Sequence, residues 1–209
     1  MSRGGRFVVL EGLDGAGTTT QARLLAEALR RRGRKAHVTA EPSGGPVGAL
    51  IRQVLTRRVG GGAGQGFDAG ALALLFAADR LDHLAAEIEP RLAAGVDVVC
   101  DRYTLSSLAY QGVTTGKLGW VETLNARAIA PDVTLFLRVR PAVSFARRKA
   151  ASPEPELFEV DAFQRQVARA YLRGIAALRG ARQRVVELDG EAPVPEVAAA
   201  VLAEVDRIR

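Results

Sequence analysis

A glycine-rich segment near the amino terminus has the composition and spacing of a phosphate-binding loop. It reads Gly12-Leu13-Asp14-Gly15-Ala16-Gly17-Thr18-Thr19, which matches GxxxxGK followed by Ser or Thr, except that Thr18 stands where lysine is expected. Its glycines let backbone N–H groups turn towards phosphate oxygens, and the helix that follows adds partial positive charge. An ordinary turn between a strand and a helix is the alternative. We expect phosphate binding by Gly12, Gly15, Ala16, Gly17, Thr18, Thr19 and Thr20.

The threonine at position 18 removes a positive charge from this loop. In P-loop enzymes the lysine reaches the β- and γ-phosphates and offsets negative charge that grows during phosphoryl transfer. Thr18 can donate a hydrogen bond but carries no charge, and removing one preorganised donor at such a site costs about 3–4 kcal/mol. The sequence therefore predicts either another cation near the loop or weak catalysis.

Five segments together carry a specific pattern, and they span most of the chain. They are residues 7–21, 41–48, 75–80, 101–112 and 131–134. In this combination the chain resembles the thymidylate kinases, a family of P-loop nucleoside-monophosphate kinases, and residues 101–112 are the most telling part. The resemblance implies phosphoryl transfer from ATP with Mg²⁺ to dTMP, giving dTDP and ADP in dTTP biosynthesis. It also implies a short lid at about residues 147–160 and usually a homodimer.

Phe76 and Arg80 are candidates for binding a nucleobase. They are four residues apart on an expected helix and so share a face, where a ring could stack on a base while a guanidinium binds its edge. On spacing alone, a core phenylalanine and a solvated arginine are the more common outcome, but the resemblance assigns both residues to thymine. The full set that we expect to bind dTMP is Asp14, Glu41, Pro42, Phe76, Arg80, Arg102, Ser106, Ser107, Tyr110 and Gln111.

Arg102, Ser106 and Tyr110 are also spaced by four, so one helix face could present a cation and two hydroxyls to a single ligand. We expect Arg102 to bind the acceptor phosphate; a surface arginine at a helix start is the alternative. Asp14 lies inside the phosphate loop, where its charge is unfavourable unless it pairs with an arginine or accepts from the nucleotide sugar. The resemblance places Asp14 between acceptor and donor.

Mg²⁺ would need oxygen ligands, and two residues are placed to supply them. Thr19 occupies the loop position whose hydroxyl binds Mg²⁺, and Asp101 ends an expected strand, where open α/β sheets bind ligands. Asp101 could instead cap the next helix, or do both. Glu11, at the end of the first strand, is a further candidate for positioning the metal or an arginine.

A basic cluster, Arg147, Arg148 and Lys149, precedes the proline-rich residues 152–155. The resemblance puts the lid here and matches Arg147 to an arginine that the family keeps. We expect one of these cations to reach the β/γ-phosphates in place of the missing lysine; a solvated helix face is the alternative. The expected catalytic residues are Asp14, Arg102, Arg147 and Arg148.

Short apolar runs alternate with helical stretches along the whole chain. We expect strands at 7–10, 37–39, 96–100, 133–137 and 184–188, and helices at 19–32, 47–58, 69–94, 104–111, 118–130, from 141, at 160–179 and at 194–207. Residues 60–66 predict a flexible loop by composition. The alternation predicts an α/β fold with a doubly wound, five-stranded parallel sheet, helices on both faces and a single domain over residues 1–209.

Composition narrows the function classes further. The 209 residues are 48% apolar and 25% charged, which is ordinary for a soluble globular domain. The single cysteine, Cys100, rules out an internal disulfide and ends an apolar run, which predicts a buried thiol. No run is long enough for a membrane span, so we expect a cytoplasmic protein without membrane partners. A net charge of +6 favours anionic partners, but without a basic tract we expect no nucleic acid.

His37 and His83 lack metal-ligand spacing and are expected to be surface or structural residues, and Trp120 is expected to pack.

Some positions depart from the family pattern and keep alternative functions open. Ala40 and Leu157, like Thr18, stand where the family often has a basic residue, and Arg138 stands where aspartate is common. One alternative is a kinase for another deoxynucleoside monophosphate such as dUMP. Another is a catalytically weak or inert nucleotide-binding homologue, against which the intact acceptor residues argue.

Overall fold

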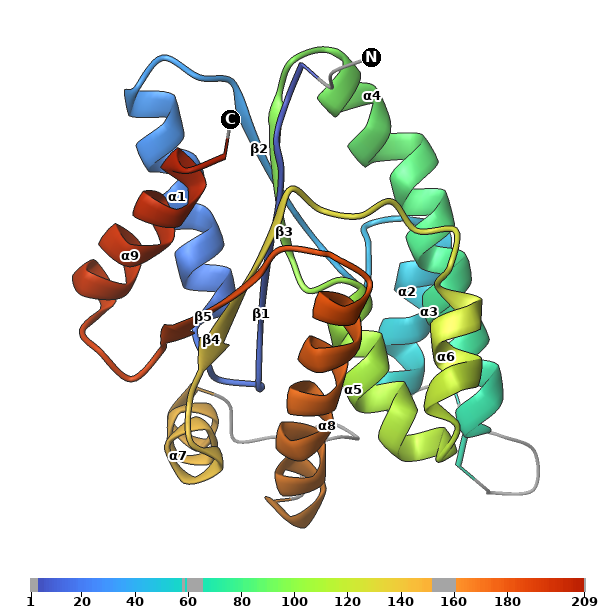
Figure 1. Ribbon diagram of the computed structural model, residues 1–209. Helices are drawn as coiled ribbons and strands as arrows, with labels where there is room; N and C mark the ends of the chain where they lie inside the picture. The colour runs from blue at the N-terminus through green and yellow to red at the C-terminus, as the bar shows by residue number, and fades with distance from the viewer. Residues whose placement is uncertain (1–3, 58, 60–65, 152–160, 209) are drawn as a thin grey trace.

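Five parallel strands form one sheet in the order β2-β3-β1-β4-β5. The computed structural model (Figure 1) describes residues 4–57, 59, 66–151 and 161–208. The strands are β1 (Phe7–Gly12), β2 (Ala36–Ala40), β3 (Asp97–Asp101), β4 (Val133–Arg138) and β5 (Val185–Asp189). Every strand pair is parallel, which confirms the predicted α/β architecture.

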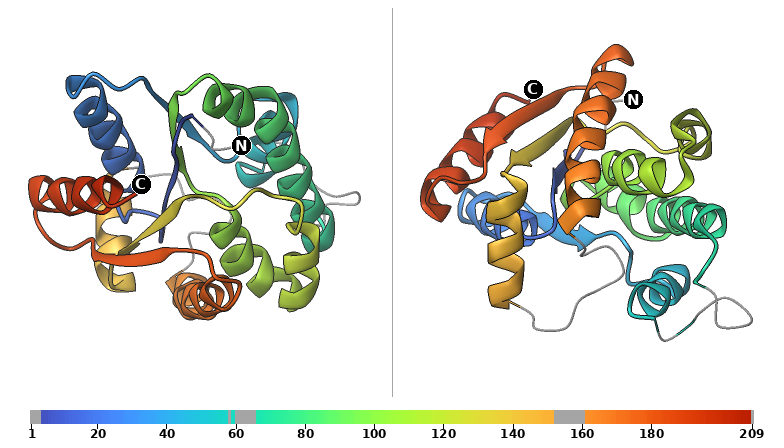
Figure 2. Two further views of the ribbon diagram at one scale, coloured as in Figure 1. Left: turned by 45° about the horizontal axis from the view of Figure 1, so that its top comes forward. Right: turned by 90° about the horizontal axis from the view of Figure 1, so that it is seen from below.

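Helices connect the strands and cover both faces of the sheet. They are α1 (Thr18–Arg31), α2 (Pro46–Leu55), α3 (Ala69–His83), α4 (Glu89–Ala93), α5 (Thr104–Thr115), α6 (Leu118–Leu124), α7 (Pro141–Ala151), α8 (Asp161–Gly180) and α9 (Val194–Asp206). Helices α1 and α9 lie side by side on one face, whereas α4, α5 and α8 cover the other (Figures 1 and 2).

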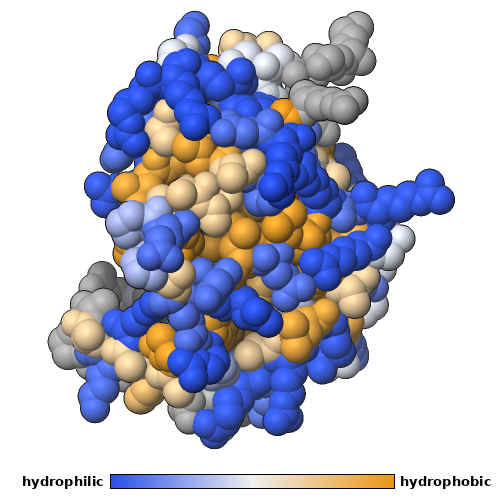
Figure 3. All heavy atoms as spheres, turned by 60° about the vertical axis from the view of Figure 1, so that its left-hand side comes forward, coloured by the Kyte–Doolittle hydropathy of each residue, from blue (hydrophilic) through white to orange (hydrophobic). Residues whose placement is uncertain are grey.

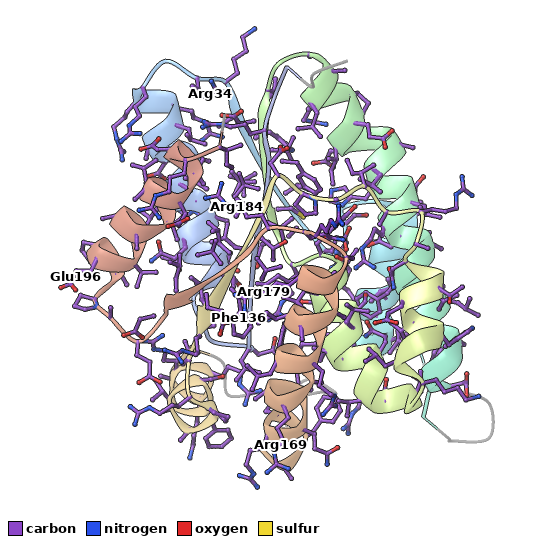
Figure 4. The ribbon with its side chains drawn as sticks, viewed as in Figure 1. Arg34, Phe136, Arg169, Arg179, Arg184 and Glu196 are labelled. Atoms are coloured by element: carbon purple, nitrogen blue, oxygen red, sulfur yellow. The ribbon has the colours of Figure 1, made fainter. Side chains whose placement is uncertain are left out.

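The central strand β1 is buried on both sides, as expected for a parallel sheet between two helical layers. Val8 and Leu10 belong to the core under α1 and α9, whereas Phe7 and Val9 pack into the opposite layer. On that side Phe136 of β4 points towards α8 (Figure 4), where its ring centroid lies 5.0 Å from that of Tyr171.

The long helix predicted at 69–94 is continuous but changes its winding. A π-helical turn, η2 (Leu84–Ile88), separates α3 from α4. It comes just before Pro90, whose nitrogen cannot donate to the carbonyl four residues earlier, so the regular ladder is interrupted at that point.

The helix predicted at 118–130 is too long, because α6 ends at Leu124. Asn125 ends it: its side-chain amide donates to the Val121 carbonyl, and its side-chain oxygen accepts from Arg80. Such side-chain bonds compete with the helical ladder. Trp120 of α6, which was expected to pack, is covered in part and remains 36% exposed.

Two predicted features lie wholly or largely outside the described residues. They are the glycine-rich loop at 60–66 and the lid at 147–160, including the proline-rich residues 152–155 and Leu157. Among the helices that are described, none combines the length and apolarity needed to cross a membrane.

The carboxyl ends of the strands gather the segments singled out from the sequence. In the sheet register Leu10 lies beside Asp101, and Gly12 beside Leu137. Both chain termini lie at the opposite end of the sheet (Figure 1). Charged side chains are spread over the molecule: Arg34 and Arg169 project at opposite ends (Figure 4), and hydrophilic residues surround an apolar band over α1 and α9 (Figure 3).

Candidate active site

A cavity of about 610 Å³ opens at the carboxyl ends of the strands. The residues predicted from the sequence that line it are Asp14, Gly15, Gly17, Thr18, Thr19, Thr20, Glu41, Pro42, Phe76, Arg80, Arg102, Ser106, Ser107, Tyr110, Gln111, Arg147 and Arg148. Four other predicted residues do not line it: Gly12, Ala16, Glu11 and Asp101. Its position at this sheet edge is where open α/β folds bind ligands.

The phosphate loop is shaped by glycines in left-handed conformations. Gly15 has φ 86° and Gly17 has φ 93°, a region that side chains with a Cβ rarely adopt. Gly17 offers no side-chain cap to α1, and the first turn of α1 has no acidic residue. The N–H groups at the start of α1 and the helix dipole are therefore available to an anion, whereas the Ala16 N–H donates to the Leu13 carbonyl at 2.9 Å. Gly12 packs behind the loop, where an added Cβ would lie 2.8 Å from the Ala16 Cβ.

Thr19 and Asp101 place two side-chain oxygens next to each other at the loop. The Thr19 hydroxyl donates to Asp101 Oδ2, whereas Asp101 Oδ1 is buried without a hydrogen-bond partner among the described residues. Asp101 does not cap α5, whose N-cap is Tyr103. Hard oxygen ligands with one unused lone-pair site suit Mg²⁺. Within the described chain, no three acidic, histidine or cysteine side chains cluster to form an all-protein metal cage.

Glu11 supports α5 rather than the metal position. One of its carboxylate oxygens accepts from the backbone N–H groups of Tyr103 at 2.8 Å and Ser106 at 3.0 Å. The other accepts from the Ser106 hydroxyl at 2.6 Å and lies 3.3 Å from the Tyr171 hydroxyl oxygen. Burial raises the pKa of Glu11 to about 7, although these hydrogen bonds and the charge of Arg102 oppose the shift. Because both oxygens are used, Glu11 is no metal ligand here; it reaches Arg102 only through shared partners.

Arg102 and Asp14 form an ion pair at the mouth of the loop. Arg102 Nη2 bonds to one carboxylate oxygen of Asp14, and Gln164 Nε2 donates to the other at 2.9 Å. Arg102 Nη1 also donates to the Gly12 carbonyl at 3.0 Å. The backbone of Arg102 has φ 71°, a strained conformation for a residue with a Cβ, of the kind found at functional sites. The charge of Asp14 is thus offset by an arginine, one of the two solutions expected from the sequence.

Arg80 is almost completely buried at the back of the cavity, 1% exposed. Its Nη2 lies 2.6 Å from Glu41 Oε2, and both Nη atoms lie 3.1 Å from the Ser107 hydroxyl. Its guanidinium carbon lies 5.1 Å from the centre of the Tyr103 ring. The Nε–H of Arg80 is buried and has no partner among the described residues. One donor of this fixed group therefore remains available to a ligand, and Phe76 lines the same cavity one turn earlier.

Glu41 is held in turn by His83, whose Nδ1 lies 3.4 Å from Glu41 Oε1. His83 is 2% exposed, and its Nε2 lies 2.8 Å from the Thr39 hydroxyl. At the edge of this cluster His37 pairs with Glu87 at 2.6 Å. Both histidines are structural, as expected, and Cys100 is fully buried, as its apolar run predicted.

Several residues of the site were not predicted from the sequence. Leu55 and Tyr103 line the cavity, and Tyr103 stands inside the diagnostic segment 101–112. Tyr171 donates to the Gly12 carbonyl at 2.9 Å, and Ser144 donates to the Asp14 carbonyl at 2.5 Å. Tyr171, Gln164 and Ser144 lie in helical stretches without a motif, so nothing local marks them.

Helix α7 lies against the phosphate loop, below the end of β4 in Figure 1. Arg147 Nη1 donates to the Gly190 carbonyl at 2.8 Å, and Lys149 is exposed. The three guanidinium nitrogens of Arg148 are buried and have no hydrogen-bond partner among the described residues. Its guanidinium carbon lies 5.7 Å from the centre of the Phe145 ring.

Comparison with known proteins gives a consistent result over almost the whole chain. The profile of the family described as "Thymidylate kinase" matches residues 10–201. The chain is 37% identical to a thymidylate kinase of Magnetococcus marinus, over 97% of this chain and 96% of that relative. It is 39% identical to a probable thymidylate kinase of Pyrobaculum calidifontis, over 96% of each chain. It is 40% identical to a thymidylate kinase of Nitrobacter winogradskyi, over 97% of this chain and 88% of the relative.

Proposed function

This chain belongs to the thymidylate kinase family, and we propose that it transfers the γ-phosphoryl group of ATP to dTMP, giving dTDP and ADP in dTTP biosynthesis. The observation that carries the proposal is one cavity that combines a phosphate loop with two arginines set for different parts of an acceptor nucleotide. Arg80 lies at the closed, buried side and Arg102 at the mouth of the loop.

The base subsite consists of Phe76 and Arg80. The ring of Phe76 stacks on thymine, and the unused Nε–H of Arg80 donates to a carbonyl of the base. Ser107 and Glu41 hold the guanidinium in place, so the donor does not have to be ordered when the ligand binds. Pro42 and Gln111 complete the wall of this subsite.

The acceptor phosphate lies beside Arg102. Ser106 and Tyr171 hold the guanidinium from one side and Asp14 from the other, which directs it towards the phosphate loop. Tyr110, whose ring centre lies 5.5 Å from the Arg102 guanidinium carbon, lines the space between base and phosphate. Asp14 then lies between acceptor and donor and keeps Arg102 oriented.

The donor phosphates bind the backbone N–H groups of the loop and the start of α1. Thr19 and Asp101 would hold Mg²⁺, which neutralises charge on the β- and γ-phosphates when bound. In the transfer, an oxygen of the dTMP phosphate forms a bond to the γ-phosphorus. The bond from that phosphorus to the bridging oxygen breaks, and its electron pair leaves with ADP. The protein contributes position and charge, and forms no covalent intermediate.

The test is ADP release by the purified protein with ATP and Mg²⁺, using dTMP beside dUMP, dCMP, dGMP and AMP. We expect turnover with dTMP to exceed that with the other acceptors, and Arg80→Met to raise the KM for dTMP. Turnover that prefers another acceptor would refute the substrate assignment. Tight dTMP binding without turnover, with activity gained by Thr18→Lys, would favour the alternative of an inert nucleotide-binding homologue, to which the neutral Thr18 points.

We also propose that the protein acts as a homodimer in the cytoplasm. Leu74 of α3 and Trp120 of α6 are exposed on helices that contact each other, which leaves apolar side chains for a second copy to cover. Light scattering on the eluting protein should give twice the chain mass, and Leu74→Glu should shift it to the monomer. A wild-type monomer at micromolar concentration would contradict the dimer.

A further inference from the structure

The part of the cavity formed by the phosphate loop has no basic side chain of its own. Helix α1 begins with Thr18, Thr19 and Thr20, so the loop and its first turn carry no basic side chain. The two arginines of the acceptor side are both paired with carboxylates, Arg80 with Glu41 and Arg102 with Asp14. Helix N–H groups alone supply only partial charge, whereas the β- and γ-phosphates of a nucleotide carry several negative charges.

Helix α7 is fastened to the loop at the point where a cation is missing. The Ser144 hydroxyl donates to the Asp14 carbonyl, and a Cβ added at Gly15 would lie 2.7 Å from the Ser144 carbonyl oxygen. The same added Cβ would lie 3.0 Å from Cγ of Arg148, so the stem of this arginine runs along the loop backbone. Arg148 also lines the cavity.

The guanidinium of Arg148 has the signature of a group whose partner is a ligand. Its three nitrogens are buried and unbonded within the described part of the chain, although buried polar groups are almost always paired. The ring of Phe145 supports the guanidinium on one side, which restrains it without using any of its donors. Arg148 therefore presents unused donors beside the loop.

The neighbouring cations of α7 lack this combination. Arg147 also lines the cavity, but one of its donors is engaged by the Gly190 carbonyl and its side chain is exposed. Lys149 is exposed and is not among the residues that line the cavity. Of the three basic residues, Arg148 is therefore the one whose charged group is buried and unpaired beside the loop, within the described part of the chain.

We infer that Arg148 binds the β- and γ-phosphates of the donor nucleotide and takes the role of the missing loop lysine. The inference rests on the proposed function, because it assigns a donor-site residue to that reaction. The guanidinium of Arg148 forms no covalent bond and offsets the charge that moves to the bridging oxygen as the phosphoryl group leaves. A guanidinium can bind two phosphate oxygens at once, so it differs from lysine in geometry as well as in position.

The test compares Arg148→Ala, Arg148→Lys and Thr18→Lys with the double variant Thr18→Lys/Arg148→Ala. Arg148→Ala should lower kcat about 10²–10³-fold while the KM for dTMP changes by less than about threefold. In the Arg148→Ala background, adding Thr18→Lys should raise kcat at least about tenfold. In the wild-type background the same substitution should raise kcat by a smaller factor. Arg148→Lys should fall between wild type and Arg148→Ala. Arg147→Ala and Lys149→Ala should each lose less than Arg148→Ala.

A binding measurement keeps the inference separate from the proposed function. By calorimetry, Arg148→Ala should weaken ATP binding and leave dTMP binding unchanged, whether or not the protein turns over, and its Tm should stay near that of the wild type. An absence of turnover in the wild type would defeat the proposed function while this comparison still decides the role of Arg148. Unchanged kcat and ATP affinity in Arg148→Ala, or a larger loss in Arg147→Ala, would overturn the inference.

Discussion

The buried ion pair between Arg80 and Glu41 allows a prediction that separates folding from binding. Both side chains are nearly inaccessible, 2% and 3% exposed, and their charged atoms lie 2.6 Å apart. Replacing Glu41 with glutamine keeps the shape but leaves the Arg80 charge buried without its counterion. Removing one partner of a buried pair costs about 3–5 kcal/mol. The Ser107 hydroxyl and the Tyr103 ring still contact the guanidinium, so we expect the low end, about 3 kcal/mol.

The double variant Glu41→Gln/Arg80→Met should regain most of this loss, because no uncompensated charge remains in the core. It should nevertheless raise the KM for dTMP about 10- to 100-fold, since the donor to the base is gone. Stability is measured by urea unfolding followed by circular dichroism, and the KM by ADP release. For a domain of this size, a loss of about 3 kcal/mol corresponds to a Tm lower by about 6–12 °C.

A matched exposed pair provides the control. Arg32 and Asp206 lie 2.7 Å apart but are 50% and 46% exposed, so Asp206→Asn should cost less than about 1 kcal/mol. Two results would refute the reasoning: a Glu41→Gln protein as stable as Asp206→Asn, or a double variant less stable than Glu41→Gln alone. Either would mean that the Arg80 charge is not held chiefly by Glu41.

Three further predictions concern pH and the loop. The pKa of Glu11 is raised from 4.5 to about 7, so between these pH values the folded state keeps a proton that the unfolded state releases. The stability that this group contributes is therefore present below pH 4.5 and is lost as pH rises through about 7. Glu11→Gln should therefore remove a decline of about 3 kcal/mol between pH 5 and pH 7.5 in urea unfolding; equal slopes in both proteins would contradict it. Burial opposes ionisation of Asp97, but its hydrogen bonds with Arg34 and Arg6 outweigh this and hold the pKa of Asp97 well below its usual value. Asp97→Asn should therefore destabilise the protein at pH 7, and the difference in stability should shrink as pH falls below 3.8; a difference as large at pH 2 as at pH 7 would count against this account. Gly15→Ala should lower the free energy of unfolding by about 1–2 kcal/mol and weaken ATP binding, because the φ angle of Gly15 is 86° and the new Cβ would lie 2.7 Å from the Ser144 carbonyl oxygen. An ATP affinity that is unchanged by calorimetry would show that the loop tolerates the side chain.

The sequence predicted the elements whose signals are local. The strand β1, the glycine turn and the start of α1 are contiguous, and their spacing alone describes a loop around an anion. Helical spacing placed Phe76 and Arg80 on one face, whereas their assignment to one binding site came from the resemblance to the family. Buried Cys100 follows from its apolar run in the same way.

Features that depend on distant contacts were not predictable. Helix α6 ends early because Asn125 bonds Arg80, which lies 45 residues away in sequence. The Tyr171 hydroxyl donates to the carbonyl of Gly12, which lies 159 residues away in sequence, and no sequence motif on α8 predicts this contact. The choice between Arg147 and Arg148 needs the orientation of α7, since adjacent helix residues point about 100° apart. The burial of Glu11 likewise depends on how α5 docks.

The fixed position of Arg80 has a consequence for which bases the site can distinguish. The Arg80 Nε–H is held rigidly and has no acceptor among the residues that the structure describes. Such a donor selects for a base edge with a carbonyl and rejects one with an amino group, because two donors would face each other without a shared acceptor. Thymine and uracil present a carbonyl at the position where cytosine carries an amino group. In the proposed base subsite, an Arg80 donor that faces the C4 position would therefore discriminate against cytosine but would be indifferent to the thymine methyl group, whose recognition would depend on the shape of the wall around it.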